Sequence, residues 1–215
     1  LLKSARKAGD LTMDGIAYGR LLNEIGRTYA DMDLYGSAAE QYKAAAKEFE
    51  SAGELVLKAK VLTSLGMVYL HERDSEKALA VLKTAVETLS AEGESTFLVR
   101  ALIPYGAALA DSGSIEDALK IHKKAAKLAR RGSDHDVYIQ ALIEEGYDHF
   151  LYGDMEKALK QYLRGQIISE TNKRIWLNVL RTITTMPEVQ LEEDEENLKQ
   201  PIDPLPENAF ARITS

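Results

Sequence analysis

The sequence of 215 residues contains no cysteine and only five prolines. Without cysteine there is neither a disulfide framework nor a thiolate metal site, which is typical of a reducing compartment, so we expect a soluble, cytoplasmic protein. No apolar run reaches the roughly 18 to 20 residues that cross a membrane, so we expect no membrane insertion. The series of charged, apolar and small residues that marks a secretory signal is also missing.

The formal charge is unevenly distributed along the chain. Residues 187–215 hold eight acids and two bases, so they account for −6 of the formal net charge of −7. The rest of the chain is therefore nearly neutral. Nucleic-acid binding relies on a positive surface that displaces counterions from phosphates, so we expect no nucleic-acid partner.

Four stretches of the sequence repeat at a strict spacing of 40 residues. A glycine recurs in each apolar stretch, although glycine inside a helix costs about 1 kcal/mol relative to alanine. Small residues let two backbones approach closely, so we expect this glycine where the two helices of a repeat cross. The recurring residues are Leu22, Leu62, Leu102 and Leu142; Gly26, Gly66, Gly106 and Gly146; and Ala38, Ala78, Ala118 and Ala158.

Each repeat divides at a short segment of Gly, Asp and Ser residues, which favour turns and helix caps. The pattern predicts a helix, a turn and a second helix in every repeat. First helices are expected at 16–31, 55–71, 96–111 and 136–151, and second helices at 35–51, 75–91, 115–130 and 155–171.

The ends of the sequence depart from this pattern. Residues 1–10, which lack an initiator methionine, match the end of a second helix, so we expect a partial repeat of a longer protein there, followed by four repeats over 11–172. Residues 173–186 place apolar side chains, including Trp176, on one face, which is typical of a capping helix. Residues 187–215 are acidic and contain PIDPLP, so they cannot form a further repeat.

With the recurring glycine as the eighth position, each repeat has leucine at position four, alanine at twenty and a bulky residue at twenty-four. The bulky residues are Tyr42, Leu82, His122 and Tyr162. This pattern resembles the tetratricopeptide repeat (TPR) over residues 16–172. The period of 40 residues is longer than the usual ~34, and is similar to that of kinesin light chains, of Pins/LGN adaptors and of regulatory domains in some bacterial signalling proteins.

The resemblance implies an all-α, right-handed superhelix whose first helices line a concave groove that binds a peptide or protein. Basic residues recur at the second position, as Arg20, Lys60 and Arg100, which favours an extended acidic peptide. The lysine and asparagine clamp with which some family members hold a terminal carboxylate is mostly missing. The candidate groove residues are Arg20, Asn23, Arg27, Lys60, Ser64, Met67, Arg100, Ile103, Gln140, Ile143, Tyr147 and Phe150.

Other chemistry has weak support. The four histidines lack the close helical spacing of a zinc site, and we expect His122 and His149 to be packing residues. Glu144 and Glu145 are adjacent on a helix and point about 100° apart, so they do not suit an acid–base pair. The basic residues within 123–131 suit a solvated helix face. We therefore expect no enzyme, no catalytic residue, no cofactor and no metal.

Two functions remain open from the sequence. The first is an interaction scaffold, or adaptor, that holds an extended and acidic segment of a partner protein in its groove. The second is a regulatory module of a larger signalling protein, whose groove is occupied by its own acidic tail or by a signalling ligand.

Overall fold

The computed structural model describes residues 14–93, 95–132 and 134–168, and every one of its helices follows the predicted repeat. The first helices of the four repeats are α2 (Gly15–Asp31), α4 (Leu55–His71), α6 (Ser95–Asp111) and α8 (His135–Tyr152). The second helices are α3 (Tyr35–Ser51), α5 (Ser75–Ala91), α7 (Ile115–Gly132) and α9 (Met155–Ile168). The expected partial repeat at 1–10, capping helix at 173–186 and tail at 187–215 lie outside the described residues.

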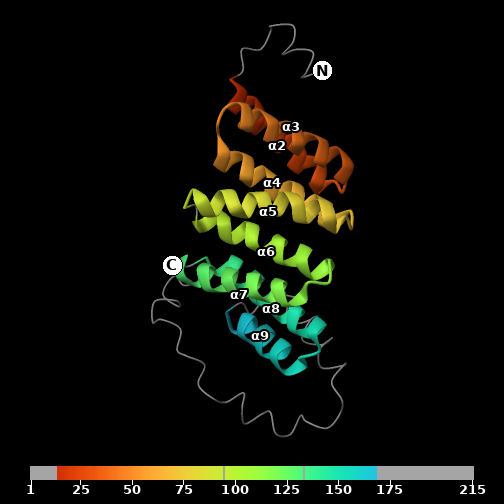
Figure 1. The fold of residues 1–215 in the computed structure, drawn as a ribbon, viewed down its shortest axis with the longest axis vertical. Helices are drawn as coiled ribbons and strands as arrows, with labels where there is room; N and C mark the ends of the chain where they lie inside the picture. Colours follow the sequence, from red (N-terminus) through yellow and green to blue (C-terminus); the bar gives the residue numbers. More distant parts are fainter. Residues whose placement is uncertain (1–13, 94, 133, 169–215) are drawn as a thin grey trace. The chain divides into compact units, whose positions relative to one another are not determined.

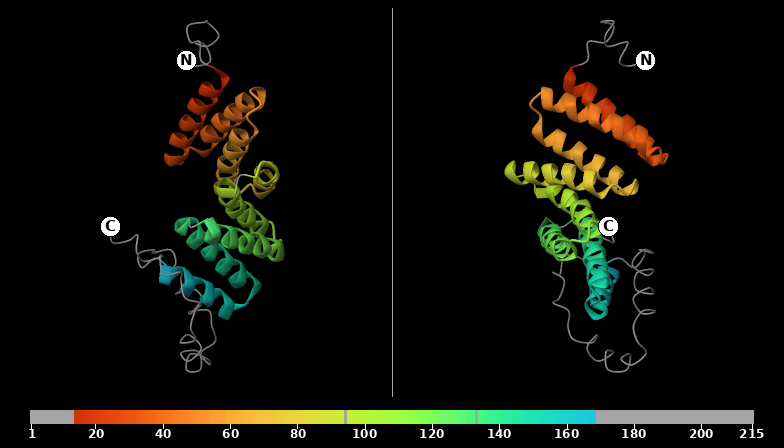
Figure 2. Two further views of the ribbon diagram at one scale, coloured as in Figure 1. Left: turned by 90° about the vertical axis from the view of Figure 1, so that its left-hand side faces the viewer. Right: turned by 45° about the vertical axis from the view of Figure 1, so that its right-hand side comes forward.

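The helices form a stack of antiparallel hairpins in chain order, as Figure 1 shows. Each helix contacts the next one along the chain. First helices also contact the first helix of the following repeat, whereas no two second helices of the described repeats touch each other. The first helices therefore form the inner layer and the second helices the outer one. Two turned views show how the hairpins change direction along the stack (Figure 2). The fold is an all-α superhelical repeat, as predicted.

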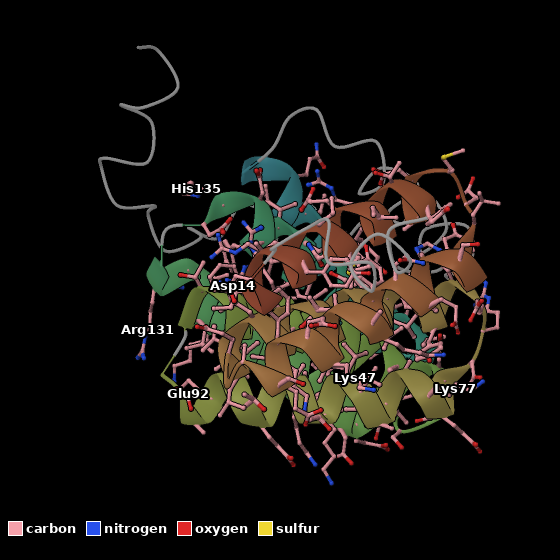
Figure 3. All side chains as sticks on the ribbon, turned by 90° about the horizontal axis from the view of Figure 1, so that it is seen from above. Asp14, Lys47, Lys77, Glu92, Arg131 and His135 are labelled. Carbon is pink, nitrogen blue, oxygen red and sulfur yellow. The ribbon has the colours of Figure 1, made fainter. Side chains whose placement is uncertain are left out.

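The two edges of the stack carry different connections, as the view from above shows (Figure 3). Asp14 and His135, at the starts of first helices, lie at the same edge as Glu92 and Arg131, at the ends of second helices. Lys77, in the first turn of α5, lies at the opposite edge. One edge therefore carries the connections between repeats, and the other carries the turns within them.

The recurring glycines lie where the sequence pattern predicts, at the crossing of the two helices of a repeat. A Cβ atom added to Gly66 would lie 2.3 Å from Cγ of Leu82, which is too close for any two atoms that are not bonded. The same holds between position eight and position twenty-four of every described repeat. The distances are 2.8 Å to Tyr42 Cε1 at Gly26, 2.3 Å to His122 Nε2 at Gly106 and 2.4 Å to Tyr162 Cε1 at Gly146.

Aspartates begin several of these helices, as the turn composition predicts. The side chain of Asp74 accepts a hydrogen bond from the backbone N–H of Lys77 at the start of α5. Asp134 caps α8 in the same way through Val137, and Asp154 caps α9 through Lys157. Each cap satisfies a backbone donor that the first turn of a helix leaves unpaired.

The turn inside each repeat reaches the left-handed backbone region at the same position. The φ angles are 58° at Asp33, 61° at Arg73, 86° at Gly113 and 89° at Gly153. This conformation costs a residue with a side chain about 1–2 kcal/mol, and glycine adopts it freely. The first two repeats therefore carry local strain that the last two avoid.

We expect Arg73→Gly to raise the free energy of unfolding by about 0.5–1 kcal/mol, because relief of this strain exceeds the entropic cost of glycine. Arg73 is exposed, so little packing is lost. Urea unfolding followed by circular dichroism measures the change. The reciprocal substitution, Gly113→Arg, should be destabilising, and stabilisation by both changes would contradict this explanation.

Candidate functional site

The predicted groove residues lie on the first helices, which form the inner layer of the stack; we call the exposed side of this layer the inner face. The three basic residues at position two of their repeats, Arg20, Lys60 and Arg100, are called the basic row. Two of them already have partners within the chain. Nζ of Lys60 lies 3.3 Å from the centre of the Phe97 ring, a cation–π contact. Nη2 of Arg100 lies 3.2 Å from Oδ2 of Asp134. Arg20 is exposed and has no ion pair among the described residues. A ligand would therefore compete with internal partners at two of these three positions.

The neighbouring polar residues of α2 form a small network around Glu24. Nη2 of Arg27 lies 2.6 Å from Oε2 of Glu24, and both side chains are more than half exposed. Asn23 donates a hydrogen bond to Oε1 of the same glutamate over 3.3 Å. Exposed pairs of this kind contribute only ~0.2–1 kcal/mol, so Arg27 can exchange its partner at little cost.

The remaining predicted groove positions hold apolar, aromatic and small polar side chains. Met67 on α4 is 49% exposed, and Ser64, three residues before it, is half-buried. On α8, the rings of Tyr147 and Phe150 stack with their centres 6.2 Å apart and their planes 11° apart. Both rings are partly exposed. Tyrosine is among the residue types that most often dominate the energy of protein interfaces, whereas Phe150 also packs against the buried cluster of Ile143 and Tyr162.

The predicted role of Ile143 as a groove anchor is wrong. Its side chain is 1% exposed and belongs to an apolar cluster with Ile139, Ala158 and Tyr162. The position corresponds to Ile103, which is half-buried on α6, but α8 buries more of its surface than the other first helices. Gln140, also on α8, is half-buried and donates a hydrogen bond to Oε1 of Glu144 over 2.6 Å.

The structure also holds a buried polar pair that the sequence analysis missed. Nδ1 of His122, on α7, lies 2.6 Å from Oδ2 of Asp148, on α8, and both side chains are 1% exposed. The other ring nitrogen, Nε2, lies 3.0 Å from the carbonyl oxygen of Ile103 on α6. His122 is a packing residue, as predicted, but it also joins three helices through hydrogen bonds.

Further polar side chains of α8 are buried near this pair. Glu145 is 5% exposed and accepts a hydrogen bond from Nε2 of Gln161 over 3.0 Å. Burial raises the pKa of Glu145 and lowers that of His149, so each residue is shifted toward its neutral form. Oδ1 of Asp148 and Nδ1 of His149 are buried without a hydrogen-bond partner among the described residues.

Within the described ranges, no three His, Asp or Glu side chains group in a way that could hold a metal ion. No helix in the same ranges is both long and apolar enough to cross a membrane.

Comparison with known proteins rests on structure alone, because no protein-family description and no curated protein matches the sequence. Aspartyl phosphate phosphatase F from Bacillus subtilis has a TM-score of 0.71 at 15% identity, over 86% of this chain and 48% of that one. A Rap protein complexed with competence and sporulation factor has a TM-score of 0.66 at 17% identity, over 80% and 48% of the two chains. This chain thus spans about half the length of both proteins.

A third solved structure matches this chain over most of the length of both proteins. It is that of nearly identical TPR-like repeats from a protein assigned as a kinesin light chain in Podosopora anserina, with a TM-score of 0.69 at 14% identity. It matches 87% of this chain and 94% of that one. Similarity at such low identity shows the fold, and it agrees with the recurring glycine and its bulky partner in each repeat. The chain is a helical-repeat protein with the fold of the tetratricopeptide repeats.

Proposed function

We propose that this protein is an interaction scaffold whose inner face binds an extended peptide segment of a partner protein. The observation that carries the proposal is the row of exposed and half-buried side chains at matching positions of successive first helices. Two solved structures with this fold are complexes: a Rap protein complexed with competence and sporulation factor, and the Rap conjugation gene regulator of plasmid pLS20 in complex with the Phr* peptide.

Spacing supports an extended ligand. Packed helices lie ~8–10 Å apart, and an extended chain advances ~3.3 Å per residue, so every third residue of a peptide can face a new first helix. Arg20, Lys60 and Arg100 occupy one register position on α2, α4 and α6. Acidic side chains at roughly every third position of the ligand would meet all three.

In this proposal the charged contacts determine selectivity and the apolar contacts supply most of the affinity. Since Lys60 and Arg100 must leave Phe97 and Asp134 to bind a ligand acid, the basic row gives selectivity for acidic segments and little affinity. Affinity would come from Met67 and from the stacked pair of Tyr147 and Phe150, which offer large partly exposed surfaces.

The binding test is a selection from a displayed random-peptide library on the full chain. Selected peptides should contain aromatic or aliphatic residues and acids about three residues apart. The double variant Tyr147→Ala/Phe150→Ala should weaken the binding of a selected peptide at least about tenfold, because aromatic anchors dominate interface energies. Reversing charge at Arg20, Lys60 and Arg100 should remove the preference for acids.

The matched control is charge reversal at Lys47 and Lys83, which are exposed on the second helices α3 and α5. Binding should be unchanged in this control. An equal loss of affinity in the control and the inner-face variants would contradict a specific inner-face site.

The alternative is a regulatory module of a larger signalling protein. It is favoured by the concentration of acid in residues 187–215. In this proposal the inner face binds the chain's own acidic segment or a signalling ligand. Truncation after Thr185 should then tighten the binding of a selected peptide, and a synthetic peptide of residues 187–215 should compete with it. Unchanged affinity and no competition would leave the scaffold as the better explanation.

A further inference from the structure

Among the described residues, the buried apolar side chains form two clusters that meet at α8. One buried cluster extends from α2 as far as Tyr138, Ala141 and Leu142 on α8. A separate cluster joins the other side of α8 to α9 through residues such as Ile143 and Tyr162. The His122–Asp148 pair lies on the side of α8 that faces the third repeat, because it links α7 to α8. It adds a buried polar contact to the apolar packing of α8 against the third repeat.

The geometry of this pair determines how many protons His122 and Asp148 must hold between them. The carbonyl oxygen of Ile103 can only accept a hydrogen bond, so Nε2 of His122 must carry a hydrogen. The contact between Nδ1 and Oδ2 of Asp148 needs a second hydrogen, on either atom. Both hydrogen bonds thus exist together only while the pair holds two protons. If one proton leaves, a lone pair faces an oxygen at one of the two contacts.

We propose that the junction between the third repeat (α6–α7) and the fourth (α8–α9) is a pH-responsive hinge. The His122–Asp148 pair fastens α8 to the third repeat while it holds both protons, and loss of one proton loosens the fourth repeat from the others. The hinge goes beyond the proposed peptide binding, because it concerns the stacking of the repeats and would exist without a ligand.

Several charged groups act on the pair, and they set the direction of the response. Burial opposes the charged form of His122, but the hydrogen bond and negative charge of Asp148, helped by Glu144, outweigh it and raise the pKa of His122. Burial also raises the pKa of Asp148, against the lowering effects of His122 and of Lys123 on α7.

The surrounding elements complete this set of charges. Glu145 and His149 lie on α8, and their pKa values are influenced by Arg164 and Lys157 of α9. Helix α6 contributes the Ile103 carbonyl to the pair. Because the folded-state pKa of His122 is raised, its stabilisation is complete below about pH 6.5, the ordinary histidine value, and is lost as pH rises through the folded-state pKa. The raised pKa of Asp148 acts in the same direction, so the junction should loosen in alkali and not in acid.

The chain contains its own control for this chemistry. His122 occupies position twenty-four of its repeat and Asp148 position ten of the next one. The same two positions at the preceding junction are Leu82 and Ala108, which are both buried and cannot titrate. The double variant His122→Leu/Asp148→Ala therefore gives the junction of the third and fourth repeats the same two residues as the junction of the second and third.

Hydrogen exchange of the full chain, followed by mass spectrometry from about pH 6 to about pH 9 and corrected for intrinsic exchange rates, tests the hinge. In the unmodified chain, protection of α8–α9 should fall at least about tenfold more than protection of α2–α5 as pH rises. In the double variant this difference should disappear. An equal loss of protection in all helices, or the same pH response in the double variant, would overturn the proposal.

A second variant keeps the test decisive if the double variant does not fold. Asp148→Asn retains an oxygen that accepts from Nδ1 of His122 but removes the negative charge. The loosening of α8–α9 should then shift to lower pH, together with the titration of the His122 ring measured by nuclear magnetic resonance. An unshifted transition in this variant would also overturn the hinge.

Discussion

Asp148→Ala is expected to lower the free energy of unfolding of the fourth repeat by about 3–5 kcal/mol near pH 6. The substitution leaves the His122 imidazolium buried without its counter-charge, and breaking one side of a buried ion pair has this cost. At a pH above the raised pKa of His122 the loss should shrink to about 1–3 kcal/mol, because only an unpaired ring nitrogen then remains buried. Urea unfolding at both pH values measures the difference.

The double variant His122→Leu/Asp148→Ala should recover most of this stability. Replacement of a buried ion pair by apolar residues is often neutral or stabilising, because the desolvation of two charges is avoided. The junction of Leu82 and Ala108 shows that this fold accepts an apolar pair at the same positions. A double variant as unstable as Asp148→Ala would mean that shape, and not charge, makes the pair important.

Gly66→Ala is expected to lower the free energy of unfolding by about 1–3 kcal/mol, the usual cost of inserting a methyl group into a packed core. The new Cβ would lie 2.3 Å from Cγ of Leu82, a branch point that cannot move away without shifting both of its methyl groups. Because the contact is with this branch point, we expect a cost in the upper part of that range, which outweighs the ~1 kcal/mol that alanine gains over glycine in a helix. Thermal and urea unfolding report the change.

A matched control separates packing from helix propensity. A Cβ added to Gly132, the last residue of α7, would meet open space among the described residues, so Gly132→Ala should not destabilise the chain. In the background of Leu82→Ala, which removes the obstructing methyl groups, Gly66→Ala should cost less than in the unmodified chain. Additive effects of the two substitutions would show that glycine is needed for another reason.

Periodicity in the sequence was sufficient to predict the helices. The described first helices begin within one residue of their predicted starts, because turn residues and the spacing of Leu22, Gly26 and Ala38 recur unchanged. The glycine crossing could be predicted because it depends on one residue and its own repeat. These features are local, so a single sequence contains enough information to find them.

The candidate site was harder to predict because it depends on contacts between repeats. Family positions could not show that α8 buries Ile143, or that Lys60 and Arg100 have partners of their own. The His122–Asp148 pair joins residues 26 positions apart in different repeats. The signal was a histidine at position twenty-four followed by an acid at position ten of the next repeat, where the preceding junctions have uncharged residues.

The location of these contacts determines which parts of the chain can be exchanged. Gly26 and Tyr42 belong to the same repeat, as do Gly66 and Leu82, so a duplicated or transplanted repeat would bring both partners with it. His122 and Asp148 belong to different repeats, and recombination between residues 132 and 134 would separate them. The glycine contacts would therefore survive the exchange of single repeats, whereas the His122–Asp148 contact survives only if the third and fourth repeats are exchanged together.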